Sequence, residues 1–523
     1  MSLKKTVAIA VAAGALAAIT VPAMAFENEF HGSYKLKYFL SNYENGGGGN
    51  PLLPAAGIVG VPAANGTGAT ENLKMNNYFE QRARMFYTAK ASDDLKLVTA
   101  FEIDTIWGDY SQGGFARSAN SNLGTVNMGT AFRNSGGAME SDAVNLETKW
   151  MYLNFKIPST PVVTNVGIMP VKDSIKGIFL DADLAGILTS TKLGAATVNV
   201  GYFRAYDQSF FATNRTRGMD NLNIGAVEGK FALSKDMNLG AVYYMYGDTR
   251  GLGSNPTAAT ALPLNVAYSS AMLHVFGLTA DAKVGPLELS GFAAYQGGIF
   301  RDVTVLSRNV GTAYHNALAY NLAAKVAAGP GKLRTALLFT SGQGDLDRQH
   351  TTGWIGVQYS PNVTNMGYNN TAANTYNESN MMLLNRAANM GGTTTDNSLV
   401  YQSGNGTNPL NSQGLYLYSL GYDANITPKF YTNANMGMAW TAKDNYLKPV
   451  DRKTGLRNST NFMGTEINVE TGYKMYDNLT ASLQAAYVIL GGYYEGSSSA
   501  GTTAAAKTPE NPYTVRTVLT YAF

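Results

Sequence analysis

The chain has no cysteine, few charged residues and, after its N-terminal segment, no long apolar run. Without cysteine there is neither a disulfide framework nor a CxxCH motif, which excludes a covalently attached c-type haem. Charged residues make up 14% of the chain, well below the ~25% of a soluble domain. No later stretch reaches the ~18 apolar residues of a membrane-spanning helix. The formal net charge is +3, or +1 without Lys4 and Lys5, which argues against nucleic acid as a partner and against a strongly single-signed electrostatic field.

The first 25 residues have the order of a secretory signal peptide. Lys4 and Lys5 precede an apolar run from Thr6 to Val21, and Ala23-Met24-Ala25 forms a small-x-small cleavage site. A membrane-anchoring helix is the alternative, but the run is short for a span of ~20 residues. We therefore expect residues 1–25 to be removed between Ala25 and Phe26. Residues 26–523 would then form a single domain with a formal net charge of +1.

What the chain has in abundance is tyrosine and glycine, 32 and 56 residues, in segments that alternate apolar and polar side chains. In the segment from Phe30 to Tyr38, large apolar residues share one face while His31, Ser33, Lys35 and Lys37 take the other. A period of two is that of a β-strand, whose successive side chains point to opposite faces. Tyrosine-rich strands with few charges are typical of a barrel with apolar positions facing lipid.

The connections between the strand-like segments alternate between very short and long. Eight short turns are expected at 92–94, 158–161, 193–194, 234–237, 285–286, 329–331, 427–428 and 477–478, because each carries turn-forming residues. Long connections are expected at 41–74, 108–145, 171–186, 208–220, 250–266, 301–313, 342–413, 442–461 and 495–511. Eight short turns predict a closed antiparallel β-barrel of 18 strands, with 16 as the alternative, short periplasmic turns and long extracellular loops. A soluble β-sandwich does not explain this regular alternation.

The last strand carries the first resemblance to known proteins. Tyr513, Tyr521 and the C-terminal Phe523 lie on one apolar face of this strand. It resembles the C-terminal insertion signal of bacterial outer-membrane β-barrels. This resemblance implies that the chain lies in the outer membrane of a Gram-negative bacterium, contacts its lipid and is inserted by the barrel assembly machinery.

A hairpin around Asp93 carries the clearest functional pattern. Arg82 and Arg84 share one face of its first strand, and Glu102 and Asp104 share one face of its second. Counting from the turn places Arg84 opposite Glu102 and Arg82 opposite Asp104. Four charges on one face cannot lie in hydrocarbon, where a basic residue costs ~2–4 kcal/mol near the midplane, so we expect them to line the lumen. Either they only brace the wall as an ion-pair ladder, or they also set the field across a pore.

Further charged residues are expected on the inner face of the barrel. They are Lys35, Lys37, Arg334, Arg516, Glu466 and Glu470. We expect Arg516 on the last strand to lie near Lys35 on the first, because those two strands close the barrel. If the charged hairpin does not set selectivity, the constriction would come from an infolded loop such as Lys172 to Asp183.

The same hairpin also resembles a family. Its sequence from Phe79 to Arg84, the turn Ala91 to Lys96, the strand end Trp107-Gly108-Asp109 and the following strand from Tyr152 to Pro158 are similar to porins of delta-class and metal-reducing bacteria. The resemblance implies a porin fold and a homotrimer, and it does not extend to the middle loops. Substrate preference is therefore not carried over.

No enzyme motif is present, and no cofactor is expected. The four histidines are dispersed, and there is no HExxH, GxSxG, P-loop or dinucleotide fingerprint. Asp345 and Asp347 could ligate Ca²⁺, but two carboxylates do not make a shell of 6–8 oxygens, which favours a solvated loop. We expect a porin that lets small hydrophilic solutes and ions diffuse through a water-filled channel. The alternative is a structural barrel that acts as a scaffold or sheath for a partner cytochrome in extracellular electron transfer.

Overall fold

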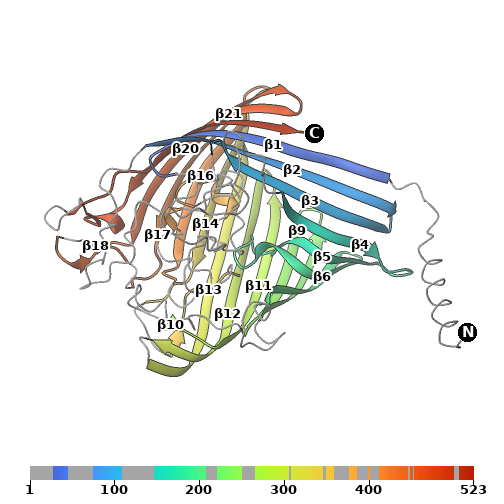
Figure 1. The fold of residues 1–523 in the computed structure, drawn as a ribbon, viewed down its shortest axis with the longest axis horizontal. Helices are drawn as coiled ribbons and strands as arrows, with labels where there is room; N and C mark the ends of the chain where they lie inside the picture. Colours follow the sequence, from blue (N-terminus) through green and yellow to red (C-terminus); the bar gives the residue numbers. More distant parts are fainter. Residues whose placement is uncertain are drawn as a thin grey trace, which may run out of the picture.

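A computed structural model describes residues 27–44, 75–108, 146–207, 221–249, 266–305, 308–344, 349–357, 376–385, 398–400, 412–445, 448–451, 453–499 and 506–523. These residues form an antiparallel barrel in which each long strand pairs with its predecessor in the chain (Figure 1). The last strand pairs with the first, from Ser33 opposite Ala522 to Ser41 opposite Thr514, and so closes the wall. The barrel predicted from the alternating connections is confirmed, with 18 strands and not 16.

The wall strands are named by their place in the chain. They are β1 (Glu27–Ser41), β2 (Asn76–Ser92), β3 (Leu95–Ile106), β4 (Glu147–Lys156), β5 (Val162–Lys172), β6 (Asp181–Leu193), β7 (Ala196–Asp207), β8 (Asn221–Ser234), β9 (Met237–Asp248), β11 (Ser270–Val284), β12 (Leu287–Val305), β13 (Arg308–Ala328), β14 (Gly331–Thr340), β16 (Leu415–Asn425), β17 (Phe430–Trp440), β20 (Phe462–Tyr476), β21 (Leu479–Leu490) and β24 (Tyr513–Ala522). All eight predicted short turns join consecutive strands of this set.

Smaller elements lie outside this set. Two short strands join the same sheet, β10 (Val266–Ala267) and β15 (His350–Thr351). Two separate ribbons are formed by β18 (Val450–Asp451) with β19 (Leu456–Arg457), and by β22 (Ser498–Ser499) with β23 (Ala506–Lys507). Two 3-10 turns are η3 (Asn377–Ser379) and η5 (Gly492–Tyr494). No helix in the described part of the chain is long and apolar enough to cross a membrane.

Two predicted connections are shorter than the sequence indicated. The expected long connection at 301–313 is wrong, because β12 continues to Val305 and β13 begins at Arg308. The polar and glycine residues there form a bulge in the paired strands, with left-handed backbone at Asp302 (φ 50°) and Gly311 (φ 82°). The connection expected at 171–186 is reduced to the eight residues between Lys172 and Asp181.

The two faces of the wall differ in character. One face exposes large apolar side chains at alternate positions, such as Phe276 and Leu278 on β11, or Leu318 and Leu322 on β13. On the other face, side chains contact loop segments from distant parts of the chain, as Gln296 of β12 contacts Ile355. Contacts of that kind are made only across the barrel interior, so this second face is the lumen. Inside the lumen lies one continuous cluster of buried apolar residues, built from wall strands and from loop segments.

Candidate functional site

The charged hairpin is assembled in the register that the sequence predicted. Arg82 lies opposite Asp104 and Arg84 opposite Glu102 on β2 and β3. Arg82 donates two hydrogen bonds to Asp104, from Nε to Oδ1 at 2.6 Å and from Nη2 to Oδ2 at 2.5 Å. Arg84 donates from Nε to Glu102, and Lys149 on β4 lies 3.8 Å from the same carboxylate. The result is a connected network in which three cations surround two carboxylates.

The acidic and the basic side chains of this network differ in how far they are buried. Glu102 and Asp104 are 2% and 1% exposed, whereas the side chains of Arg84 and Arg82 are 37% and 17% exposed. The two carboxylates of these pairs are therefore covered by protein. The charge that stays exposed at this part of the wall is therefore mainly that of the guanidinium groups. Losing one cation of a buried pair leaves an uncompensated charge, which makes such a pair costly to break.

The neighbouring wall adds three more basic side chains. Lys35 lies opposite Arg82 and Lys37 opposite Glu80 on the adjoining strands. Lys37 is buried, and Lys35 is half-buried. The predicted proximity of Arg516 to Lys35 is wrong: β1 and β24 do pair, but Arg516 lies opposite Phe39, four residues further along.

Arg516 is completely buried and does not meet the open lumen. Its guanidinium donates to Glu44, from Nε at 3.0 Å and from Nη2 at 2.5 Å. It also lies over the ring of Phe39. Glu44 follows β1, and sequence reasoning missed it because a residue in a polar connection gives no periodic signal. This ion pair fastens the chain after β1 to the strand that closes the barrel.

The remaining predicted inner residues lie on the wall from β14 to β20. Arg334 is buried, contacts Asp423 at 2.9 Å and donates to Asn435. Glu466 is buried and accepts hydrogen bonds from three backbone amides of a loop segment. Glu470 accepts from the Tyr431 hydroxyl at 3.0 Å. Arg334 and Glu466 thus hold other protein groups and are covered by them.

Among the loop segments that the structure describes, three that fold into the lumen contact one another. The first is the segment 173–180, between β5 and β6. The Asp173 carboxylate accepts backbone hydrogen bonds from Gly177, Phe179 and Leu180 at 2.6–2.7 Å, which closes the segment on itself. Burial raises the pKa of Asp173 to about 7, against the opposing effect of those three donors. An infolded loop at Lys172 to Asp183 was the alternative source of a constriction, and the structure places the infolded segment within those bounds.

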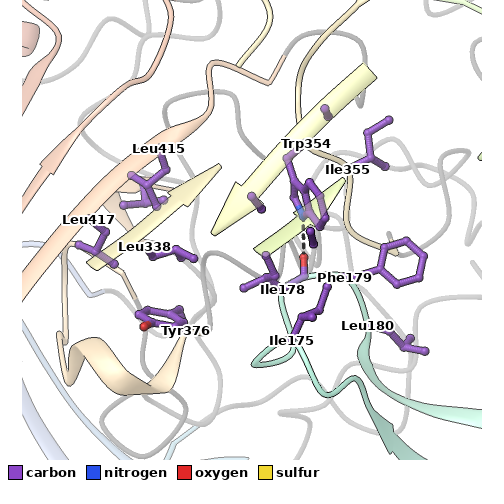
Figure 2. Packing of buried hydrophobic residues seen from close by; sticks show 14 of the residues in the cluster. Ile175, Ile178, Phe179, Leu180, Leu338, Trp354, Ile355, Tyr376, Leu415 and Leu417 are labelled. Carbon is purple, nitrogen blue, oxygen red and sulfur yellow. Dashed lines mark hydrogen bonds between the residues drawn. The ribbon is translucent and has the colours of Figure 1, made fainter. Parts of the chain in front are cut away.

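The second segment, 349–357, joins the first segment to β12 and β13. Trp354 donates its indole N–H to the Ile178 carbonyl at 3.0 Å (Figure 2), and the Val357 amide donates to the Phe179 carbonyl at 2.7 Å. Ile355 exchanges two backbone hydrogen bonds with the side chain of Gln296 on β12. The apolar parts of both segments pack together in the buried cluster.

The third segment, 376–385, lies along the inner face of the wall from β13 to β20. Tyr376 accepts a hydrogen bond from Asn321 of β13, and the amides of 382–384 bind Glu466 of β20. Lys176 of the first segment contacts Glu378 of the third at 2.8 Å. The three segments therefore form one connected body inside the barrel, which we call the inner plug. It emerges from β5 and β6 and lies against β8–β20, while the charged hairpin belongs to β2 and β3.

Other predicted residues lie outside the inner plug. Tyr521 and Phe523 stack on the outer face, 5.6 Å apart, and the Phe523 backbone exchanges two hydrogen bonds with Gly32 of β1. Tyr513 begins the same strand. The predicted cleavage site at Ala25 and Phe26, Asp109 of the strand end, and the loop pair Asp345 and Asp347 lie outside the described residues. Within the residues described, no group of three histidine or carboxylate side chains could hold a metal ion.

Comparison with known proteins gives a likeness of fold alone. No family model matches the sequence, and no curated protein matches it. Among solved structures, OccAB4 of Acinetobacter baumannii is 11% identical with a TM-score of 0.46, over 95% of this chain and 98% of that one. OpdK of Pseudomonas aeruginosa with vanillate is 8% identical with a TM-score of 0.48, and OccK2 of the same organism in complex with glucuronate is 9% identical with a TM-score of 0.46. Each covers 95% of this chain and 98% of its own. The resemblance to porins of delta-class bacteria stays a prediction.

Proposed function

We propose that this protein is a channel of the bacterial outer membrane that lets small hydrophilic solutes and ions diffuse along the wall formed by β1–β4. The closed barrel with an apolar outer face supports the membrane setting, because closure leaves no unpaired strand edge in lipid. Buried charges on the inner face are paired with other protein groups, whereas charged side chains that stay partly exposed there need water. Partly exposed guanidinium groups at Arg82 and Arg84 are the observation on which the proposal rests.

The division of the lumen supports a narrow path. The inner plug packs against β8–β20, whereas the exposed parts of Arg84, Arg82 and Lys149 lie on β2 and β4. A path bounded by the inner plug on one side and by cations on the other would favour anions, because low-dielectric walls focus the field of fixed charges. We expect anion selectivity, with the hairpin as the selectivity site.

Single-channel recording in planar bilayers tests this function. Folded protein should give stepwise conductance with a reversal potential that indicates preference for anions in a salt gradient. A folded barrel that gives no conductance steps would contradict the channel proposal. If such a barrel also co-purifies with a haem protein, the scaffold or sheath for a cytochrome partner becomes the better interpretation. The homotrimer is proposed from the family resemblance alone. The mass of the detergent-solubilised protein tests this oligomeric state.

A further inference from the structure

A pocket of about 390 Å³ lies inside the barrel, beneath the inner plug and beside the short-turn rim. Its roof includes Lys176 and Glu378, the ion pair that joins the first and third segments of the inner plug. Its wall is formed by β9, β11, β12 and β13, and the β8–β9 turn closes one side. This pocket is far along the wall from the charged hairpin, so it is a different site.

The wall of the pocket carries charges of alternating sign. Lys283 of β11 lies directly opposite Glu288 of β12, which in turn lies directly opposite Lys325 of β13. Asp281 lies two residues before Lys283 on the same face of β11. Directly opposed residues have Cβ atoms ~4.5–5.5 Å apart, so each charge has an opposite charge as its nearest neighbour.

The acidic and the basic side chains of the pocket differ in the ion pairs that they make. Asp281 pairs with Lys230 at 3.4 Å, and Glu288 pairs with Lys332 at 3.1 Å, in both cases with half-exposed partners from outside the pocket. Exposed pairs of this kind are worth little, ~0–1 kcal/mol, and exchange readily with a ligand. Within the described part of the chain, Lys283 and Lys325 make no ion pair of their own. The pocket therefore offers two ammonium groups that interact with Glu288 without a close ion pair, beside carboxylates that are only weakly held.

From this arrangement we infer that the pocket binds small zwitterions of the α-amino acid class. The ligand carboxylate would contact the ammonium group of Lys283 or Lys325, and its own ammonium group would contact Glu288, which lies between the two lysines, or Asp281. A simple anion would be attracted by the same lysines but repelled by Glu288 and Asp281. A simple cation would be attracted by these two carboxylates but repelled by the lysines. Only a solute that carries both charges a few ångströms apart is attracted on both sides. The inference deepens the proposed function, since it gives the lumen a binding site near the short-turn rim, apart from the diffusion path along β1–β4.

Binding can be measured without any current. Isothermal titration of the folded, detergent-solubilised protein with L-alanine, propionate and ethylamine compares a zwitterion with its two singly charged counterparts. We expect L-alanine to bind about tenfold more tightly than either, a difference of about 1.4 kcal/mol. The double variant Lys283→Ala with Lys325→Ala should lose about tenfold in L-alanine affinity.

A matched control uses lysines of the same barrel rim outside the pocket, Lys429→Ala with Lys474→Ala, which should leave L-alanine binding unchanged. Heat-modifiable migration checks that each variant is folded. Equal binding of propionate and L-alanine, no binding to the folded protein, or equal losses in both double variants would each overturn the inference. A barrel that binds L-alanine but carries no current contradicts the proposed channel alone, and a conducting barrel that ignores L-alanine contradicts this site alone.

Discussion

Arg82 and Arg84 are two residues apart on the same strand, and the structure predicts opposite consequences for their replacement by glutamine. Arg82 is the bidentate partner of Asp104, which is almost completely buried. Its removal leaves a buried carboxylate without its main cation, a change that typically costs ~3–5 kcal/mol. Arg84 has a half-exposed side chain and shares Glu102 with Arg82 at 3.5 Å and Lys149 at 3.8 Å. Its removal should therefore cost ~1 kcal/mol or less.

Ion preference should respond to Arg84→Gln even though stability does not. The interaction energy between a unit charge and an ion ~5 Å away in a water-like medium is about 0.8 kcal/mol. Screening at 0.1 M salt, with a Debye length of ~10 Å, reduces this to about 0.5 kcal/mol. Removing the charge should lower the local anion concentration by about two- to fourfold, since 1.4 kcal/mol is tenfold. The reversal potential in a salt gradient should shift towards cations.

Two measurements on the two variants separate the interpretations. Thermal unfolding in detergent should show a large loss for Arg82→Gln and a small one for Arg84→Gln, whereas the reversal potential should move clearly for Arg84→Gln. Lys429→Gln at the barrel rim serves as a control for the loss of one charge and should change neither. An unchanged reversal potential for Arg84→Gln in a conducting, folded barrel would mean that the hairpin only braces the wall.

Three other predictions follow from single contacts. Phe523→Ser keeps the backbone bonds to Gly32 but removes the stacked ring, and it should reduce the yield of heat-modifiable barrel more than deletion of residues 453–455 does. Glu466→Ala removes the acceptor of three amides in the segment 376–385, and it should raise conductance and speed proteolysis there without unfolding the wall. The pKa of Asp173 is raised by burial from its ordinary value of 3.8 to about 7, while Glu228 and Tyr244 face the same segment. Because the folded pKa is the higher one, this group favours docking fully below pH ~4 and loses that contribution as pH rises through about 7. Hydrogen exchange at the Leu180 amide, corrected for its intrinsic rate, should be faster at pH 8 than at pH 5, and Asp173→Asn should flatten that dependence.

The wall of the barrel was predictable from sequence because its signals are local. Alternation identifies strands, turn residues identify the short connections, and counting from the turn at Asp93 gives the pairing of Arg82 with Asp104. The inner plug was not predictable in the same way. Trp354 meets Ile178, and Glu466 meets the amides of 382–384, through contacts between residues about 80 to 180 positions apart in the chain. Such contacts leave no periodic pattern in the sequence, and the residues that make them have the composition of an ordinary connecting loop. The extended β12 and β13 were missed for a related reason: a bulge with Asp302 and Gly311 has the composition of a loop.

The near-zero net charge predicted that no strongly single-signed field would be present, and the hairpin shows why a count of charges is a weak guide to the field inside a barrel. A carboxylate is short, so at a strand position beside a long arginine it lies close to the wall and is covered. The arginine reaches past it, with its stem along the wall and its head towards the open space. Glu102 and Asp104 are thus hidden while Arg84 stays partly exposed. Equal numbers of opposite charges in a cross-strand ladder then present one sign to the lumen, and side-chain length decides which sign it is.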